Sequence, residues 1–377
     1  MATKTATKDK DTRHMLSALA LARRGLGRVW PNPAVGCVLA RQDREGRVVG
    51  RGWTQPGGRP HAETEALGRA GLKARGATAY VSFEPCDHQG QTPPCSQALI
   101  EAGVRRVVIA ARDPDPRVSG KGICRLKEAG IEVVEGVLAD QARRLNLGFI
   151  LKVTEGRPLF SLKLATDRHG SIPAPGAREK WVTGPLARQR GHLLRAEHDA
   201  VLFGMGTVLE DDPEYTCRLA GMEERSPLRV LLDSELRLAP SSKLLRTIGK
   251  SHLLVIAGSD AGGSDAFTAL ADAASSNPGN FEITVAGKSD ENGRPAAQWV
   301  ALELGRRGLT RVLVEAGPKV ASAFLKAGLI DCVYWFRAEK DLGAAGVPAA
   351  AGIDALKLDK TEVIEMGGDI LEIYGRN

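Results

Sequence analysis

The sequence lacks any apolar run long enough to cross a bilayer as a helix, which takes about 20 consecutive residues. Residues 1 to 11 are rich in Thr and Lys and have no apolar stretch of the kind that a secretory signal contains. We therefore expect residues 1 to 11 to form a disordered tail. We also expect a cytoplasmic protein with no membrane partner.

Aromatic side chains are scarce, at 5% of the chain, although the net charge is +7 and the isoelectric point is near 9.1. The basic residues are scattered, and they are not interleaved with the aromatic residues that stack on nucleic-acid bases. The composition therefore argues against a nucleic-acid partner. A basic surface and a phosphorylated small-molecule substrate fit this charge better.

The six cysteines are too few and too scattered to suggest a disulfide framework in a cytosolic chain of 377 residues. They are therefore expected to be buried apolar side chains or metal ligands. Cys37 lies inside an apolar run, and Cys332 precedes Val333 and Tyr334, so we predict that both are buried.

Hydrophobic periodicity predicts alternating helices and strands along the first half of the chain. Helices are expected over 12–25, 62–74, 96–102, 121–129 and 140–149, and strands over 34–40, 47–53, 77–83, 104–111 and 131–134. This alternation indicates a three-layer α/β domain with a largely parallel core sheet. A polar segment that ends in Pro, residues 152–158, marks the boundary to a second domain.

The second half also reads as an α/β domain. Strands are expected over 159–165, 200–203, 229–232, 252–257, 282–286 and 311–315, and helices over 186–196 and 318–327. It contains neither a G-x-G-x-x-G fingerprint nor a P-loop. The turn from Glu315 to Pro318 joins a strand to a helix start, which is a suitable place for a phosphate.

One pattern in the first half carries chemistry on its own. His61 and Glu63 are separated by one residue, and the pairs Pro85-Cys86 and Pro94-Cys95 follow. One imidazole and two thiolates leave the fourth tetrahedral position of zinc open to water, as catalytic sites require. Glu63 is then the acid/base residue that moves protons without binding the metal. His88, between the cysteines, is an alternative fourth ligand of a structural site.

The stretch E-P-C-D-H-Q-G-Q-T-P-P-C from Glu84 to Cys95 resembles the deaminase half of the bifunctional riboflavin-biosynthesis deaminase/reductase. Residues 31–36 and 113–122 also match that family. Eight residues separate the two cysteines, whereas nucleoside and nucleic-acid deaminases usually have two. The resemblance implies a cytidine-deaminase-like α/β/α domain over 12–152 and a dihydrofolate-reductase-like α/β domain over 158–377.

The resemblance also implies two reactions and their cofactors. A zinc-dependent step would deaminate 2,5-diamino-6-(5-phosphoribosylamino)pyrimidin-4-one, and an NADPH-dependent step would reduce its ribosyl group to ribityl. In the first step, Asn32 would contact the pyrimidine, and His88 and Lys121 the ribose phosphate. The family further suggests a homo-oligomer.

In the reductase half, the resemblance assigns residues by position. Arg195 and Arg218 would hold the substrate phosphate, since Arg matches phosphate with two donors. Other substrate contacts would be Lys163, Glu179, Tyr215 and Glu315. The cofactor site would be lined by Ala165, Trp181, Thr183, Thr207, Asp211 and Ser234, and by the helix start of Gly317, Pro318, Lys319, Val320, Ala321, Ser322 and Ala323.

Three positions depart from the family pattern near the substrate. His169 stands where the family usually has Asp, Glu179 where it usually has Ser, and Tyr215 where it usually has Leu. Two alternatives to the bifunctional enzyme therefore stay open. One is a deaminase joined to a reductase-like domain without activity, and the other is a nucleic-acid base deaminase.

Overall fold

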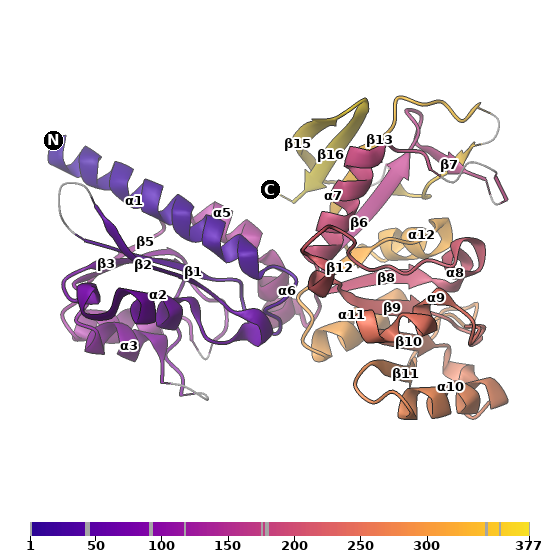
Figure 1. Cartoon of the computed structure of the whole chain (residues 1–377), viewed down its shortest axis with the longest axis horizontal. Helices are drawn as coiled ribbons and strands as arrows, with labels where there is room; N and C mark the ends of the chain where they lie inside the picture. The colour runs from indigo at the N-terminus through magenta and orange to yellow at the C-terminus, as the bar shows by residue number, and fades with distance from the viewer. Residues whose placement is uncertain are drawn as a thin grey trace. The chain divides into compact units, whose positions relative to one another are not determined.

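The computed structural model describes residues 2–41, 46–89, 93–116, 118–174, 176–177, 181–343, 346–353 and 356–376, with the backbone alone for residues 2–8. The chain forms two compact units, Met1–Gly156 and Arg157–Asn377 (Figure 1). The division lies within the boundary segment predicted at 152–158.

The first unit is built on a five-stranded sheet with the order β2-β1-β3-β4-β5. The strands are β1 (Gly36–Ala40), β2 (Val48–Trp53), β3 (Thr78–Phe83), β4 (Arg106–Ala111) and β5 (Glu132–Glu135). The pairs β3/β4 and β4/β5 are parallel, but β1 is antiparallel to both β2 and β3. The prediction of a largely parallel sheet is therefore wrong for half of the pairings. A short connection between β1 and β2 requires an antiparallel hairpin.

The helices of this unit are α1 (Ala2–Ala22), α2 (Ala62–Ala70), α3 (Cys95–Glu101), α4 (Lys121–Glu128), α5 (Ala139–Leu145) and α6 (Leu147–Glu155). The single helix expected over 140–149 is thus divided at Asn146. Two glycines show that α1 and α2 cover opposite faces of the sheet. A Cβ on Gly36 would meet the backbone of Ala18 in α1, and one on Gly52 would meet the backbone of Ala62 in α2. Gly52 pairs with Cys37, the neighbour of Gly36, so the two glycines face opposite sides.

Helix α1 begins at Ala2. The prediction that residues 1–11 form a disordered tail is therefore wrong for residues 2–11. Asp11 is 5% exposed, and its carboxylate accepts hydrogen bonds of 2.8 Å from both Nη atoms of Arg106. The Tyr80 hydroxyl donates a third, of 3.1 Å, to the same carboxylate. This buried bidentate ion pair fastens α1 to the sheet. This ion pair could not be predicted from the sequence, because the partners of Asp11 lie 69 and 95 positions away.

The second unit is built on a nine-stranded sheet with the order β11-β10-β9-β8-β12-β6-β13-β16-β15. The strands are β6 (Leu159–Thr166), β8 (Ala200–Gly204), β9 (Leu228–Leu232), β10 (Leu253–Ala257), β11 (Phe281–Val285), β12 (Arg311–Val314), β13 (Ile330–Arg337), β15 (Asp359–Met366) and β16 (Asp369–Gly375). Neighbouring strands are parallel from β11 to β13, and β16 and β15 extend the sheet antiparallel.

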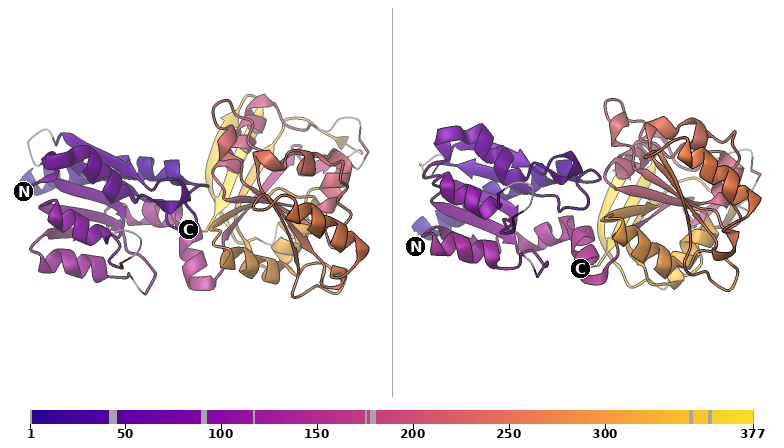
Figure 2. Two further views of the ribbon diagram at one scale, coloured as in Figure 1. Left: turned by 60° about the horizontal axis from the view of Figure 1, so that its bottom comes forward. Right: turned by 90° about the horizontal axis from the view of Figure 1, so that it is seen from below.

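Helices lie on both sides of this twisted sheet (Figure 2). They are α7 (Pro185–Ala196), α8 (Met205–Asp211), α9 (Lys243–Arg246), α10 (Asp265–Ser275), α11 (Ala297–Arg306) and α12 (Pro318–Lys326). A separate two-stranded sheet pairs β7 (Ser171–Pro173) with β14 (Gly346–Pro348).

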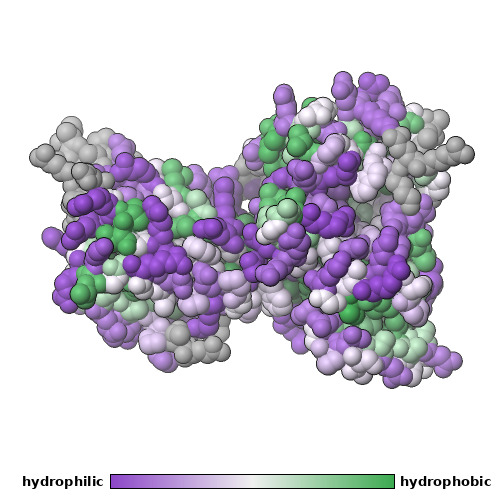
Figure 3. All heavy atoms as spheres, viewed as in Figure 1, coloured by the Kyte–Doolittle hydropathy of each residue, from purple (hydrophilic) through white to green (hydrophobic). Residues whose placement is uncertain are grey.

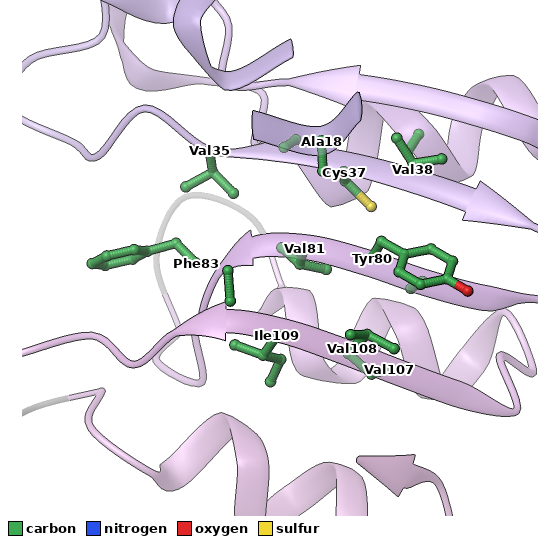
Figure 4. Packing of buried hydrophobic residues seen from close by; sticks show 14 of the residues in the cluster. Ala18, Val35, Cys37, Val38, Tyr80, Val81, Phe83, Val107, Val108 and Ile109 are labelled. Atoms are coloured by element: carbon green, nitrogen blue, oxygen red, sulfur yellow. The ribbon is translucent and has the colours of Figure 1, made fainter. Parts of the chain in front are cut away.

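Each unit has an apolar core of its own. In the first, β1, β3 and β4 contribute side chains such as Val38, Phe83 and Ile109, which are at most 1% exposed (Figure 4). Cys37 is fully buried there as predicted, whereas Cys332 on β13 is only partly enclosed. On the face in Figure 3, apolar residues form small separate areas among hydrophilic ones. Of the helices that the structure describes, none has the length and apolar character needed to cross a membrane.

Candidate active sites

The predicted zinc ligands converge at the starts of two helices. His61 is the residue before α2, Cys95 is the first residue of α3, and Cys86 lies in the segment that follows β3. The backbone N–H of Cys95 donates to the sulfur of Cys86 over 3.4 Å, and that of Ser96 donates to the Cys86 carbonyl over 3.2 Å. The start of α3 therefore fixes where the Cys86 thiol lies.

The distances between the ligand atoms fit tetrahedral zinc. Nδ1 of His61 lies 3.3 Å from Sγ of Cys95 and 3.6 Å from Sγ of Cys86. Bonds of about 2.0 Å to nitrogen and about 2.3 Å to sulfur, at a tetrahedral angle, put the two atoms about 3.5 Å apart. Within the described ranges, these three residues form the one group placed to hold a metal, and His88 is not in it. The site thus offers three ligands, as a catalytic zinc requires.

Electrostatics prepare the two sulfurs for a metal. The hydrogen bond with Cys95 lowers the pKa of the Cys86 thiol, and the nearby His61 acts in the same direction. The same hydrogen bond raises the pKa of the Cys95 thiol, and burial acts in the same direction. The positive ends of α2 and α3 add to the stabilisation of thiolate charge. A dication placed between the sulfurs would favour loss of the remaining proton.

Glu63 lies in the first turn of α2, two positions after His61, and its residue is 3% exposed. Burial raises the pKa of its carboxyl to about 7, although His61 opposes the shift. A carboxyl that titrates near neutral pH accepts and returns protons efficiently. It lies next to the ligand group without belonging to it, which is the arrangement that an acid/base residue needs.

Three residues of the first unit, Asn32, His88 and Lys121, were predicted to contact the substrate. The Asn32 side chain donates to the Gly58 carbonyl over 3.3 Å, and Gly58 stands three residues before His61. His88 and Lys121 are exposed, in the segment after Cys86 and at the start of α4. Among the described residues, no side-chain contact joins His88 or Lys121 to the zinc ligands, so their roles stay predictions.

A second polar cluster is centred on Glu315, which directly follows β12. Its carboxylate accepts 2.8 and 2.9 Å hydrogen bonds from Nε and Nη2 of Arg195, and one of 3.2 Å from Nζ of Lys163. Burial alone would raise the pKa of Glu315, but the two cations outweigh it and hold that pKa well below its usual range. The structure thus brings together three predicted substrate residues from α7, β6 and β12.

Tyr215 and His192 complete the surroundings of Arg195. The Tyr215 hydroxyl donates to the Glu315 carbonyl over 2.9 Å, and its ring stacks on that of Phe203 at 4.0 Å. Nδ1 of His192 lies 3.4 Å from Nη1 of Arg195 and accepts from the backbone N–H of Arg218 over 3.3 Å. Burial and the two arginines lower the pKa of His192 to about 4, so the ring is neutral near pH 7.

The predicted cofactor residues gather along one edge of the large sheet. Ser234, Thr207, Gly317 and Ala165 lie at or just beyond the carboxyl ends of β9, β8, β12 and β6, which are consecutive in the sheet. A Cβ on Gly317 would lie 3.6 Å from Oγ1 of Thr207, so α8 and the start of α12 are close neighbours.

The carboxyl edge of parallel strands is where α/β domains bind nucleotides, and the start of a helix attracts phosphate. The stretch from Gly317 to Ala323 covers the start of α12, so it fits the phosphates of NADPH. Trp181 is 63% exposed and stacks with Arg188 at 5.1 Å, Thr183 is buried, and Asp211 is exposed at the end of α8.

Comparison with known proteins decides the family. Residues 163–371 match the model of the RibD C-terminal domain, and residues 8–111 match that of the cytidine and deoxycytidylate deaminase zinc-binding region. The chain is 36% identical to the riboflavin biosynthesis protein RibD of Escherichia coli, over 96% of this chain and 98% of that one. The RibD of Aquifex aeolicus is 37% identical, over 97% and 98%.

The chain belongs to the RibD family. Two solved structures agree with this over almost their whole length. A RibD of Acinetobacter baumannii superposes with a TM-score of 0.84 at 34% identity, covering 98% of this chain and 99% of that one. The diaminohydroxyphosphoribosylaminopyrimidine deaminase/5-amino-6-(5-phosphoribosylamino)uracil reductase of Thermotoga maritima gives 0.83 at 34% identity, covering 98% and 100%.

Membership in the RibD family confirms the predicted fold of both halves and the pairing of a zinc-dependent deaminase with an NADPH-dependent reductase. The chain therefore has both enzyme halves. The group placed to hold a metal consists of the three predicted ligands, and the predicted cofactor residues of the second unit stay a prediction.

The departures from the RibD pattern have different surroundings. His169 is exposed and pairs with Asp341 at 3.3 Å, beside the ion pair of Arg168 with the same carboxylate. Tyr215 is buried and contributes a hydrogen bond to the Glu315 cluster. Glu179 lies outside the described residues.

Two polar residues of interest, His192 and Asn146, were not predicted from the sequence. His192 contacts both arginines of the reductase cluster, and Asn146 lies in the break between α5 and α6. Both are single polar residues in helical stretches, with partners far along the chain or across a loop. The one available signal was Asn146 itself, since Asn in the middle of an expected helix indicates competition with the helix backbone.

Proposed function

We propose that this chain catalyses two consecutive steps of riboflavin biosynthesis. The first unit deaminates 2,5-diamino-6-(5-phosphoribosylamino)pyrimidin-4-one at its 2-amino group, and the second reduces the ribosyl group of the product to ribityl. The observation that carries the proposal is the convergence of His61, Cys86 and Cys95 beside the buried Glu63, in a chain that matches RibD from end to end.

In the deaminase, His61, Cys86 and Cys95 would hold zinc, which when bound would supply an activated water near neutral pH. Glu63 would accept one proton from the water that adds to the ring carbon and pass it to the ring nitrogen. It would then carry the remaining proton of the added hydroxyl to the amino group, which leaves as ammonia. Its burial favours this exchange, because it brings the carboxyl's pKa close to neutrality. Asn32 orients the pyrimidine, and His88 and Lys121 bind the ribose phosphate.

In the reductase, NADPH when bound would supply the hydride that reduces C1′ of the sugar in its open Schiff-base form. The α12 start and the carboxyl ends of β6, β8, β9 and β12 hold the cofactor. Arg195 and Arg218 bind the substrate phosphate, and Lys163 and Glu315 lie near the sugar. Because Glu315 stays ionised between two cations, it is suited to stabilise the positive charge of the Schiff base.

The proposal includes a cytoplasmic location and a homo-oligomer, and it takes a phosphorylated pyrimidine as the substrate. All six cysteines are free thiols, which fits a reducing compartment. The oligomer follows from the family resemblance alone.

A two-step assay tests the proposal. Purified protein of known zinc content receives the diaminopyrimidine phosphate while ammonia is measured, and NADPH is then added and its oxidation followed. We expect about one zinc per chain, ammonia release and NADPH oxidation. Ammonia without NADPH oxidation would mean that the second unit binds without reacting. Neither signal, with zinc present, would refute the assigned substrate.

A further inference from the structure

The backbone just after Asn32 is fastened by buried polar side chains on its way into β1. The N–H of Val35 donates to the Thr54 hydroxyl over 3.0 Å, and the N–H of Gly36 donates to the Ser82 hydroxyl over 2.9 Å. Thr54 and Ser82 are at most 2% exposed. Ser82 lies in β3 and Thr54 directly follows β2, and both strands pair with β1, so these bonds are local to the sheet.

The third fastening comes from another part of the unit. Oδ1 of Asn146 accepts a 2.8 Å hydrogen bond from the N–H of Ala34, and its Nδ2 donates a 3.0 Å bond to the Ala34 carbonyl. Asn146 is 3% exposed and lies 112 positions from Ala34. Its amide pairs with both polar groups of one residue, as a neighbouring strand would, because an amide side chain carries a donor and an acceptor together.

Asn146 lies outside the part of the chain that defines the zinc centre. The match to the deaminase zinc-binding region ends at residue 111, and His61, Glu63 and both cysteine ligands fall within it. Asn146 occupies the break between α5 and α6, so the helix is interrupted at the residue that reaches back to Ala34. The two helices thus bring a side chain to the segment that carries Asn32.

Asn32 needs such support. Among the described residues, its side chain makes one hydrogen bond, of 3.3 Å, to the Gly58 carbonyl. Its direction therefore depends on the backbone on both sides, which is held by the bond from the Asn32 N–H to the Val29 carbonyl and by the contacts of residues 34–36. A bound pyrimidine must meet the amide of Asn32 within hydrogen-bonding distance while its ring carbon faces the zinc site. A small movement of this segment is enough to spoil that alignment.

We propose that Asn146 is a positioning residue of the deaminase, which holds Asn32 in its substrate-binding position through the backbone of Ala34. This inference rests on the proposed function, in which Asn32 contacts the pyrimidine. A merely structural Asn146 would stabilise the α5–α6 break and have no particular relation to Asn32. The two roles differ in whether the effect of Asn146 depends on Asn32.

A double-mutant cycle in the full-length zinc enzyme separates them. The variants are Asn146→Ala, Asn32→Ala and the double variant, with Gln141→Ala as the matched control. Gln141 is an exposed amide on α5, the helix that ends one residue before Asn146. Deaminase kcat and KM come from ammonia release. Zinc content reports on the fold of the first unit, and NADPH oxidation with the deaminated substrate reports on the second.

We expect Asn146→Ala to lower deaminase kcat/KM about 10- to 100-fold, with zinc and NADPH oxidation unchanged. In the Asn32→Ala background the same change should cost less than about twofold. Gln141→Ala should equal the wild type. Asn146→Asp keeps the size of the side chain and the bond from the Ala34 N–H, but it turns an oxygen toward the Ala34 carbonyl. It should therefore also lower deaminase kcat/KM, because only one of the two bonds to Ala34 remains.

Losses that multiply in the double variant would overturn the inference, and so would loss of zinc in both Asn146 variants. If Asn146→Ala alone loses zinc, the cycle is run with Asn146→Asp and judged by the same rule. A wild type that releases no ammonia refutes the proposed function, and the inference falls with it. An active wild type with independent effects refutes the inference alone.

Discussion

Replacing Glu315 by Gln tests whether the reductase cluster is held together by charge. The carboxylate accepts three hydrogen bonds, two from Arg195 and one from Lys163, and its side chain is 15% exposed. Gln keeps one acceptor oxygen, but it removes the negative charge and turns an N–H toward a cation. Two buried positive charges would then face each other without compensation.

The expected loss of stability follows from what it costs to break a buried ion pair. Removing one partner destabilises by about 3–5 kcal/mol, and the retained amide oxygen favours the lower end of that range. In a unit of roughly 200 residues, 1 kcal/mol shifts Tm by about 2–4 °C. We therefore expect the Tm of the second unit to fall by roughly 6–12 °C at pH 7.

The stability that Glu315 contributes should depend on pH. The two cations hold the pKa of Glu315 well below its usual range when the protein is folded. In the unfolded chain its pKa returns to about 4.3. The carboxylate therefore contributes its full stability above about pH 4.3 and loses it as the pH falls through the folded-state pKa. Gln does not titrate, so the difference in Tm between wild type and Glu315→Gln should shrink below pH 4.

Calorimetry of the zinc enzyme measures these shifts, and ammonia release serves as an internal reference for the first unit. Asp341→Asn is the matched control, because its carboxylate pairs with Arg168 on the surface and exposed pairs contribute little. Its Tm should stay at the wild-type value. A Tm of Glu315→Gln within about 1–2 °C of the wild-type value at pH 7 would show that the charge of Glu315 does not hold the cluster together.

Three further predictions concern the first unit. Glu63→Gln should lower the kcat of deamination about 10²- to 10⁴-fold, because the proposed role of Glu63 is to move protons. Metal analysis should still find zinc, since Glu63 is not in the ligand group, and loss of zinc would contradict its assignment. Removing zinc with a chelator should abolish ammonia release but leave NADPH oxidation with the deaminated substrate unchanged, and failure of both would mean that the metal also supports the second unit. Arg106→Met should destabilise the first unit by about 3–5 kcal/mol in a denaturant titration, because Asp11 would stay buried without its partner; an unchanged midpoint would show that α1 does not depend on this ion pair.

The sequence predicted elements best where apolar residues follow a clear period. The strands at β3, β4 and β8 were located to within about two residues, because their side chains are almost all buried. Strand β15 was missed because six of its first seven residues are exposed, and it becomes a strand by pairing with β16. The start of α1 was missed for a related reason, since its anchor at Asp11 depends on Arg106, far along the chain.

The two sites differed in how far the sequence alone could describe them. His61, Cys86 and Cys95 announce zinc by residue type and spacing, so the chemistry could be derived before any family was named. Arg195 and Glu315 are ordinary charged residues 120 positions apart, and only the fold brings them together. Their assignment needed the family resemblance. The donors and acceptors of the individual hydrogen bonds could be read only from the structure.

Gly52 gives a final example of how a residue can matter to a metal that it never touches. A Cβ there would run into the backbone of Ala62, the residue after His61. Relieving that collision would lift the start of α2 by about 1 Å, whereas zinc–ligand distances tolerate changes of about 0.2 Å. Because Gly52 has no side chain, the start of α2 can approach β2 closely enough to keep His61 in its position at the metal site. Variation at this position should therefore be read with the metal ligands and not with the core.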